Sequence, residues 1–556
     1  MVGKLPDIIA RLLAKRGITG EAAVDEFFSP SLRNLACPTD LPGISAAVET
    51  ILAAEGKVVV FGDYDCDGIC ATAIVVSCLK ALRPSLDVAP FLPKRLEEGY
   101  GMSEASVARL LAEHPDVRLV VTVDNGINSV ERVAELRARG VKVVVTDHHL
   151  PGETLPVADA VVNPKVAAPA ALEGLCGAGV AFLLANALVS TAKERGLYEG
   201  PALGGPLLVL AGLATVTDIM PLVGQNRIIV SEALRRFRTW APIGLRELLD
   251  RASRSGTVQL TTKDFGFTIG PRINAAGRIA SGMEALELIL SDDREIAREL
   301  AHIVDLHNTE RKAKEQVMTE AAFAKIVPGA AAQVIELPDG HLGVVGIVAS
   351  RVMEHLGDTV PVCVVVGGHG SARAPDGINI RDAFEACKSV LTQYGGHAAA
   401  GGFSVAEGQV SRFREMLCDY CRRLPRPVDG VRKVDEPDFW VDPSALTVDL
   451  AEWLTRMEPF GEGNPEPVFG IRGAVFADVR PLGAEGKHLQ VSFRDRRIPR
   501  AVWWNHGDLV DSLRRASFLR RDIRFTVELS TYGERHVELR LVGIVDSDDD
   551  NGIDSF

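Results

Sequence analysis

The chain has 556 residues, of which 47% are hydrophobic and 24% are charged, with a formal net charge of −13. This length excludes one ordinary domain and fits three or four, and the lack of an apolar run of about 18 residues predicts no membrane span. The acidic balance argues against a protein that binds long duplexes nonspecifically, although a narrow basic groove for a threaded single strand remains compatible with it.

Residues 1–42 are predicted to form a helical lead-in that ends at the Pro-containing segment ACPTDLPG. The segment MVGKLPDIIARLLAKRG has apolar residues at helical spacing but lacks the continuous apolar core and the cleavage site of a signal peptide. The nine cysteines are an odd number without framework spacing, which is typical of reduced thiols. We therefore expect a cytoplasmic protein.

An α/β domain is predicted over residues 43–230. Its apolar runs are unbroken, as in strands of a parallel sheet that are buried on both faces. It closes with the apolar helix LLVLAGLATVTDIM, which presents Asp218 near its end. Helices of ordinary crossover length should join the strands, which are expected at 57–61, 86–91, 117–123, 141–146 and 159–162.

Three of these strands end at carboxylates or histidines, in VVVFGDYDCDG, LVVTVDNG and VVVTDHH. Because ligands bind at the carboxyl ends of parallel strands, these side chains should converge at one edge of the sheet. So many unpaired carboxylates would repel one another unless divalent cations bind between them. The residues concerned are Asp63, Asp65, Asp67, Asp124, Asp147, His148 and His149.

Simpler interpretations fit parts of this pattern. DYDCDG resembles the opening of a calcium-binding loop, but Ile74 stands where that loop needs a Glu. Asp124 alone fits a helix N-cap or a turn, and the two histidines alone fit ordinary loop residues. The repetition on three strands favours a metal site, and imidazole beside carboxylates favours Mn²⁺ or a similar ion over Ca²⁺.

A helical connector is predicted at 231–329, including a long charged helix at about 291–326 that we interpret as a solvated spacer. A second α/β domain is predicted at 330–425. Its segment GGHAAAGG, with His397, lets backbone N–H groups approach an anion, while a close-packed turn is the alternative. Ser371 and Arg373 in the neighbouring GSARA offer a hydroxyl and a planar guanidinium suited to phosphate oxygens.

Residues 436–545 change to short alternating strands, which predict a small OB-like β-barrel, and an acidic tail follows at 546–556. Trp503 and Trp504 are adjacent, so only one can face the core, and the other can stack on a base or pack on the strand. Nearby arginines should contact a nucleic-acid backbone, or else form a solvated hairpin tip: Arg494, Arg496, Arg497 and Arg500.

The chain resembles the DHH phosphoesterases, which are named for the triplet Asp147-His148-His149, and within them the single-strand-specific DNA exonucleases. Ten segments carry the resemblance in the family's order: GDYDCDG (62–68), PKRLEEGYG (93–101), VDNG (123–126), TDHH (146–149), LATVTDIMPL (213–222), GPRINAAGR (270–278), GVVGIVASR (343–351), GSARA (370–374), GGHAAAGG (395–402) and EPFGEGNPEP (458–467). The resemblance implies two α/β domains, of DHH and DHHA1 type, around a metal cleft, with a long connecting helix and a C-terminal OB-like barrel.

The implied activity is hydrolysis of single-stranded DNA from the 5′ end to mononucleotides, in DNA repair and recombination. By the resemblance, Asp124 bridges two Mn²⁺ or Mg²⁺ ions, His149 contacts the scissile phosphate, and Asp63 and Asp147 support the ligands from behind. The implied metal ligands are Asp65, Asp67, Asp124, His148 and Asp218. The residues implied to position the strand and its 5′ phosphate are Arg95, Tyr100, Arg272, Asn274, Arg278, Ser371, Arg373, Gly396 and His397.

One position departs from the family pattern. Many relatives carry a His four residues before the first metal-binding Asp, and this chain has Phe61 there, so one ion is expected to have fewer protein ligands. Two other functions remain open: a DHH phosphoesterase of short oligonucleotides or cyclic dinucleotides, which would not need the barrel, and a noncatalytic replication scaffold. The expected partner is single-stranded DNA, a helicase and a single-strand-binding protein are candidate partners, and a monomer is expected.

Overall fold

The computed structural model describes residues 5–201, 203–254, 260–424, 436–483, 485–530 and 535–546. The chain divides into two compact units. The two-sheet unit contains Leu35–Met220 and Gly224–Arg432, and the barrel unit contains Met1–Asn34, Pro221–Val223 and Lys433–Phe556. Within the described ranges, the helices are all too short or too polar to cross a membrane.

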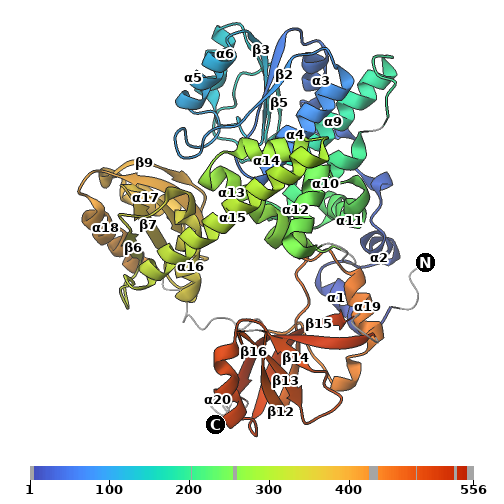
Figure 1. The fold of residues 1–556 in the computed structure, drawn as a ribbon, viewed down its shortest axis with the longest axis vertical. Coiled ribbons are helices and arrows are strands. Elements are labelled where there is room, and N and C mark those ends of the chain that lie inside the picture. The colour runs from blue at the N-terminus through green and yellow to red at the C-terminus, as the bar shows by residue number, and fades with distance from the viewer. Residues whose placement is uncertain are drawn as a thin grey trace. The chain divides into compact units, whose positions relative to one another are not determined.

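The first sheet is fully parallel, with strand order β2-β1-β3-β4-β5. Helices α5 (Glu104–Glu113) and α6 (Val130–Ala138) cover one face, and α3 (Ile44–Leu52), α4 (Cys66–Leu82) and α9 (Gly177–Glu194) cover the other (Figure 1). Two short helices, α7 (Pro164–Ala167) and α8 (Ala170–Glu173), precede α9. The predicted strands are confirmed to within two residues at each end: β1 (Lys57–Phe61), β2 (Val88–Phe91), β3 (Val117–Val123), β4 (Lys142–Thr146) and β5 (Ala160–Val162).

A helical region follows this sheet. It contains α10 (Gly204–Thr217), α11 (Gly224–Trp240), α12 (Ile243–Leu249), α13 (Gly270–Ile279), α14 (Gly282–Leu290), α15 (Arg294–Phe323) and π-helical turns at Asp250–Arg254 and Asp264–Ile269. The predicted long helix is confirmed as α15, but its interpretation as a solvated spacer is wrong. Ala297, Ala301 and Val304 are buried, because α15 packs against α12, α13 and α14.

The second sheet has the order β6-β7-β8-β10-β9, and only β6 and β7 run parallel. GGHAAAGG is the tip of the β9–β10 hairpin, where Gly396 pairs with Gly401. Gly396 has φ 134° and a Cβ there would lie 2.4 Å from the Ala400 oxygen, so the hairpin requires glycine. The elements are β6 (Gln333–Glu336), β7 (Val362–Val366), β8 (His369–Arg373), β9 (Leu391–Gly396), β10 (Ala400–Val405), α16 (Val345–His355), α17 (Ile380–Ala386) and α18 (Val410–Arg423).

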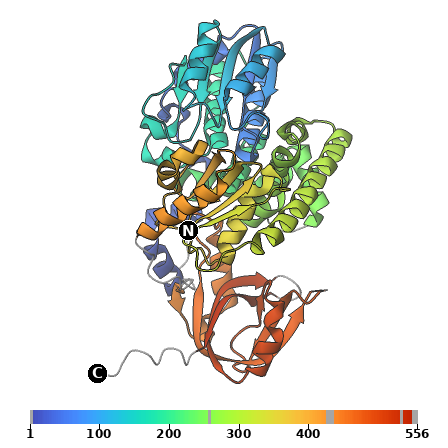
Figure 2. The ribbon, with the colours of Figure 1, turned by 90° about the vertical axis from the view of Figure 1, so that its left-hand side faces the viewer.

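The barrel unit closes on itself, because β12 pairs with both β13 and β15 (Figure 2). Its core contains Phe469 and Phe525 together with Ile9 and Leu12 from the N-terminal helix, so the first helices of the chain pack with the last domain. The elements are α1 (Asp7–Lys15), α2 (Glu21–Phe28), β11 (Phe439–Trp440), α19 (Val448–Arg456), β12 (Phe469–Leu482), β13 (His488–Phe493), β14 (Ala501–Trp503), α20 (Val510–Arg515), β15 (Arg520–Ser530) and β16 (His536–Asp546).

Candidate active site: an acidic and histidine cluster

The strand ends of the first sheet meet as the sequence predicts. Asp63 and Asp65 follow β1, Asp124 follows β3, and His148 and His149 follow β4. Three groups of potential ligands have their ligand atoms within 4.8 Å of one another: Asp124, His148 and His149; Asp67, His148 and Asp218; and Asp63, Asp65 and Asp124. These overlapping groups form one cluster at the carboxyl edge of the sheet.

Local structure fixes each of these carboxylates. Asp65 is the N-cap of α4, and its Oδ1 accepts hydrogen bonds from the backbone N–H groups of Asp67 and Gly68, each at 3.0 Å. Asp124 has φ 62°, a left-handed backbone conformation that few residues besides Gly, Asn and Asp adopt. Asp218 follows the last residue of α10 as its C-cap. The cluster therefore draws on turns and helix ends from four places in the chain.

The centre of the cluster is His148. Its Nε2 lies 3.1 Å from Asp124 Oδ1, 3.6 Å from Asp67 Oδ2 and 3.6 Å from Asp218 Oδ2. Burial, and then the nearby His149, lower the pKa of His148 to about 3, so its imidazole is neutral. A neutral imidazole facing three carboxylates has the protonation state of a metal ligand.

The carboxylates are strongly destabilised as anions when no cation is bound. Burial, and then repulsion from Asp65, raise the pKa of Asp67 to about 6, while burial and Asp67 raise that of Asp218 to about 9. Burial and Asp67 also raise the pKa of Asp124 well above its ordinary value. The oxygens Asp63 Oδ1 and Asp124 Oδ1 are buried without a hydrogen-bond partner within the described residues. Bound divalent cations would satisfy these oxygens and relieve the repulsion.

Phe61, the position that departs from the family pattern, is fully buried and packs against Phe91 with ring centroids 5.1 Å apart. It fills the core between the sheet and its helices and contributes no ligand.

Asp147 lies behind the cluster and orients His149. Its Oδ1 lies 2.7 Å from His149 Nδ1 and accepts the backbone N–H of His148, while its Oδ2 accepts that of Ile127. Burial alone would raise the pKa of Asp147, but the hydrogen bond with His149 and the attraction of its charge outweigh burial and lower it. The same contact raises the pKa of His149 despite its burial. Asp147 thus fixes the orientation of the His149 ring and favours its protonated form.

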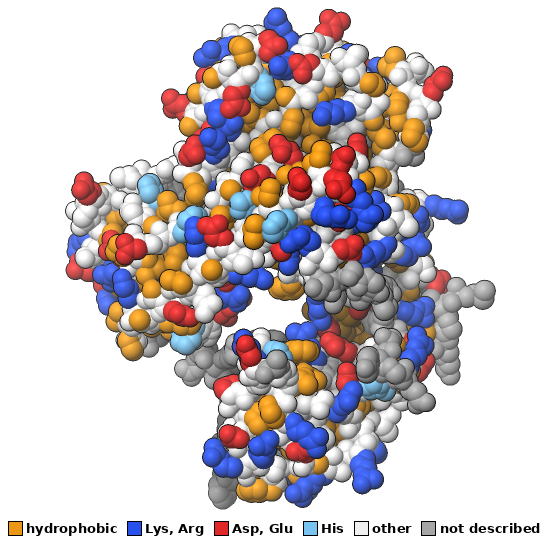
Figure 3. Space-filling model, viewed as in Figure 1, with side chains coloured by type: hydrophobic (Ala, Val, Ile, Leu, Met, Phe, Trp, Pro, Cys, Tyr) orange, Lys and Arg blue, Asp and Glu red, His pale blue; other side chains and the backbone are white. Residues whose placement is uncertain are grey.

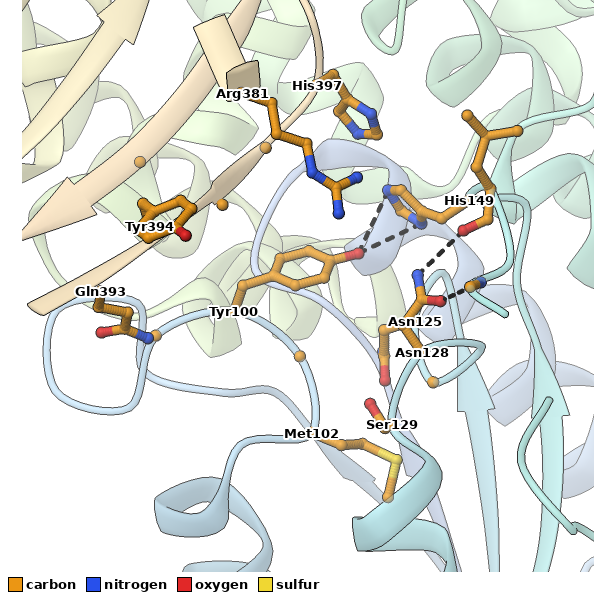
Figure 4. A pocket seen from close by; sticks show the side chains of 18 of the residues that line it. Tyr100, Met102, Asn125, Asn128, Ser129, His149, Arg381, Gln393, Tyr394 and His397 are labelled. Atoms are coloured by element: carbon orange, nitrogen blue, oxygen red, sulfur yellow. Dashed lines mark hydrogen bonds between the residues drawn. The ribbon is translucent and has the colours of Figure 1, made fainter. Parts of the chain in front are cut away.

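Tyr100 closes the other side of His149. Its hydroxyl donates to the carbonyl oxygen of Asp124 at 3.1 Å and lies 3.3 Å from the ring nitrogens of His149 (Figure 4). His149 and Tyr100 therefore lie together directly beside the acidic and histidine cluster.

A second group of predicted residues is basic. Arg95, Arg278 and Arg373 form no ion pair with a described carboxylate, although Asp65 attracts Arg278 and Arg95 attracts Asp63. The Arg373 Nη1 donates to Ser371 Oγ at 3.0 Å and to the Ala372 oxygen at 2.8 Å. Burial and then Arg95 lower the pKa of both Arg278, to about 10, and Arg373. Arg95 thus repels both Arg278 and Arg373, and three guanidinium groups in a part-buried site are suited to a polyanionic group such as a terminal phosphate.

The structure places the other two residues of GPRINAAGR differently. Arg272 Nε forms an ion pair with Asp305 Oδ1 at 2.8 Å and its Nη1 donates to the Thr268 oxygen. The Asn274 side-chain oxygen accepts the backbone N–H of Cys66 at 2.8 Å. Arg272 is thus bound to α15, and Asn274 holds the loop that carries Asp65 and Asp67.

A cavity of about 1060 Å³ adjoins His149, between the loops of the first sheet and the β9–β10 hairpin of the second. In Figure 4, Arg381 and His397 point toward His149 and Tyr100 from the opposite wall. Sequence reasoning missed several polar residues of this lining, namely Asn125, Asn128, Ser129, Arg381, Gln393 and Tyr394. Gln393 and Tyr394 directly precede GGHAAAGG in the sequence, and this position beside a predicted substrate-binding motif is the signal that could have identified them.

The barrel carries exposed aromatic and basic side chains. Trp504 is 46% exposed, whereas Trp503 packs on the barrel core and stacks on His506. Arg497 is paired with Asp495 and Arg500 with Glu538, which leaves less of their charge for another anion. Figure 3 shows Lys and Arg side chains spread over the face of the barrel that it displays.

Family models match three segments of the chain. They are the N-terminal domain of the DHH family at 57–204, the DHHA1 domain at 329–423 and the RecJ OB domain at 437–542. Among curated proteins, the single-stranded-DNA-specific exonuclease RecJ of Dickeya dadantii is 37% identical, over 84% of this chain and 84% of its own length. The chain belongs to the RecJ family. The resemblance stated from the ten sequence segments is thereby confirmed.

RecJ of Thermus thermophilus is 39% identical over 84% of this chain, and the match spans 66% of that protein. The crystal structure of RecJ from Thermus thermophilus in complex with Mn²⁺ aligns with a TM-score of 0.79 at 33% identity, covering 98% of this chain and 78% of that one. Its complex with Mg²⁺ aligns with a TM-score of 0.74 at 32% identity, covering 97% and 77%. The predicted fold class is confirmed: two α/β domains, a long helix and an OB barrel of the RecJ family.

Proposed function

We propose that this RecJ-family chain is a single-stranded-DNA-specific exonuclease that hydrolyses the strand from its 5′ end and releases mononucleotides. The observation that carries the proposal is the adjacency of two sites of opposite charge. The acidic cluster fits divalent cations, and Arg95, Arg278 and Arg373, whose guanidiniums form no ion pair with a described residue, fit a terminal phosphate. A site that grips a terminal phosphate close to the metal ligands would restrict cleavage to that end of the strand.

The metal site in this proposal holds two Mn²⁺ or Mg²⁺ ions. Asp124 would hold both ions, and Asp63 Oδ1 is near enough to Asp65 and Asp124 that it could add a ligand where the usual His is Phe61. The remaining ligands are Asp65, Asp67, His148 and Asp218. Bound divalent ions lower the pKa of a water and offset negative charge on the phosphate during in-line displacement.

The chain's own residues then orient and neutralise the substrate. His149, held by Asp147 and Tyr100, is placed to donate a hydrogen bond to a phosphate oxygen at the cluster, because its raised pKa keeps a proton available. Ser371 and Arg373 offer a hydroxyl and a guanidinium to the 5′ phosphate, as the sequence predicted.

The cavity beside His149 supplies a path for the strand. Arg381 makes no ion pair with any described residue, and together with His397 it can neutralise backbone phosphates. Tyr394 and Gln393 on the same wall can contact bases. Arg272 and Asn274, which the sequence predicted as substrate contacts, support the proposal indirectly by holding α15 and the acidic loop.

The two alternative functions have less support. The barrel, which a phosphoesterase of short oligonucleotides or cyclic dinucleotides would not need, matches the RecJ OB model. A noncatalytic scaffold would not need the complete cluster of carboxylates and His148. We further propose that the protein acts as a monomer in the cytoplasm, with a helicase and a single-strand-binding protein as partners. All nine cysteines lie in the described part of the chain and none is in a disulfide, which supports a reducing compartment.

The test uses single strands labelled at either end, and the matching duplex, with Mn²⁺ or Mg²⁺. A 5′ label should appear at once as a mononucleotide, while a 3′ label should pass through a ladder of shortening strands. The duplex should resist. Early release of the 3′ label as mononucleotide would contradict hydrolysis from the 5′ end. Equal rates of hydrolysis on a two-nucleotide substrate and on a long strand would favour the short-oligonucleotide alternative.

A further inference from the structure

Asp67, one of the proposed metal ligands, is held by the first turn of α9. The backbone N–H of Gly177 donates to Asp67 Oδ2 and that of Ala178 donates to Oδ1, each at 2.7 Å. Both oxygens are thereby fixed by one helix N-terminus, whose dipole also favours a negative charge. The plane of this carboxylate is therefore set by α9, a helix that supplies no ligand itself.

Gly177 also touches the second ligand. A Cβ on Gly177 would lie 2.5 Å from Asp124 Cβ and 2.6 Å from Asp124 Oδ1. Real Cβ atoms do not approach other atoms this closely, so one of the two residues would have to move. Asp124 is buried, and its left-handed backbone at the end of β3 fixes the direction of its side chain.

The backbone of Gly177 does not itself require glycine. It is helical, and Gly177 is not among the residues of positive φ. Ala favours a helix more than Gly does, so helix formation alone would select Ala at this position. The three atoms nearest to a Cβ at this position all belong to Asp124, and their close approach explains a glycine here.

Cys176 completes the arrangement. It is the N-cap of α9, and its Sγ accepts the backbone N–H of Gly179 at 3.3 Å. The same Sγ lies 3.6 Å from Thr215 Oγ1 on α10, three residues before Asp218. Cys176 thus ties the turn that holds Asp67 to the helix that presents Asp218.

We infer that Gly177 is a positioning residue that sets the spacing between Asp67 and Asp124. Its N–H holds one carboxylate, and the missing side chain lets the other carboxylate lie against the helix end. This inference rests on the proposed two-ion site, since the spacing of two ligands has a catalytic consequence only where they share ions. Cys176 supports the same geometry by fixing the turn.

The experiment compares Gly177→Ala with Gly179→Ala in the full chain. Gly179 is the matched control, because it lies in the same turn and the nearest atoms to a Cβ there belong to Leu175, at 3.2 Å, and to Cys176, not to a proposed metal ligand. Mn²⁺ binding to the DNA-free protein is measured by calorimetry. Gly177→Ala should weaken Mn²⁺ affinity about 10- to 100-fold, the usual effect of losing support for a metal ligand, while Gly179→Ala should bind as the wild type does.

Two further readouts separate positioning from folding. The metal-free Gly177→Ala protein should still unfold in one cooperative transition well above the assay temperature, although the displaced side chain lowers its melting temperature. Its KM for single-stranded DNA should stay unchanged while kcat drops and recovers partly at high Mn²⁺. If Gly177→Ala does not fold, the Mn²⁺ affinities of Cys176→Val and Cys176→Ser are compared instead. Val removes the thiol and should weaken Mn²⁺ binding, whereas Ser keeps the cap and should restore it.

Two results overturn the inference. Normal Mn²⁺ affinity in folded Gly177→Ala, or equal affinities of the two Cys176 variants when that pair is used, shows that α9 does not set the ligand spacing, although the metal site itself stands. Failure of the wild-type protein to bind Mn²⁺ instead removes the proposed function, and the inference with it.

Discussion

Replacing Arg373 should remove most of the preference for a 5′-phosphorylated strand. Arg373 is held by Ser371 and the Ala372 oxygen, lies near Arg95, and has no carboxylate partner among the described residues. Its charge therefore has no counterion within the described chain, and a phosphate would supply one. Arg373→Ala leaves the predicted metal ligands untouched, because all of them lie in the other α/β domain.

The size of the effect follows from the contact that is lost. A hydrogen bond to a charged group contributes about 1.5 to 3 kcal/mol, so Arg373→Ala should reduce the ratio of kcat/KM for 5′-phosphate over 5′-hydroxyl strands by roughly 10- to 150-fold. Arg373→Lys should restore only part of the preference, since an ammonium group cannot donate two parallel hydrogen bonds.

The assay measures kcat/KM on matched 5′-phosphate and 5′-hydroxyl oligonucleotides for the wild type and both variants. Arg351→Ala is the control, because Arg351 lies on α16 of the same domain and pairs with Glu315 and Glu354. Mn²⁺ affinity should be equal in all four proteins. A phosphate preference that survives Arg373→Ala refutes the assignment, and Arg278 or Arg95 then becomes the candidate anchor.

Three further predictions follow from the same geometry. The pKa values of Asp67 and Asp218 are raised to about 6 and about 9 in the metal-free protein, so folding favours the protonated carboxyl groups. Their contribution to the free energy of unfolding therefore falls as pH rises from about 4 to about 9. Below these pKa values, Mn²⁺ must displace protons to bind. The rise in melting temperature on adding Mn²⁺ should therefore grow from pH 6 to pH 8, and a pH-independent rise would contradict this. Asp147→Asn should lower the pKa of His149, observed by NMR, and reduce kcat about 10- to 100-fold; an unchanged His149 pKa would show that Asp147 does not hold its proton. Trp504→Ala should raise KM for long strands several-fold and leave very short ones unaffected, whereas equal effects would assign the barrel a structural role.

The strands and the metal cluster could be predicted because both depend on local patterns. Unbroken apolar runs identified β1, β3 and β4, and parallel pairing places their carboxyl ends at one edge wherever they occur in the sequence. Asp218 was within reach of the same reasoning, because it ends a helix that is buried along most of its length.

The roles within GPRINAAGR could not be assigned from the motif alone. Asn274 and Arg278 are four residues apart and lie on one face of α13, whereas Arg272 points to α15 and Asp305. Without knowing that the segment is helical, sequence reasoning treated all three as substrate contacts. The packing of α15 against α12, α13 and α14 determines which face of α13 contacts α15 and which faces the acidic loop. This is a tertiary contact that the motif itself does not encode.

Long-range packing accounts for the remaining surprises. Ile9 and Leu12 share a core with Phe469 and Phe525, more than 400 residues away in the sequence, and no local pattern marks such a pairing. Likewise, the contact between Gly177 and Asp124 depends on how α9 meets the end of β3. Arg381 enters the cavity because α17 packs beside the β9–β10 hairpin.

The most direct test of the account replaces the bridging carboxylate. Asp124→Ala should abolish hydrolysis of end-labelled single-stranded DNA with Mn²⁺ while leaving DNA affinity largely intact, because the proposed strand contacts lie on other residues. The variant must be shown to be folded, for example by an unchanged circular dichroism spectrum. Near-normal turnover by folded Asp124→Ala with Mn²⁺ would contradict the central claim that this acidic cluster is the site of catalysis.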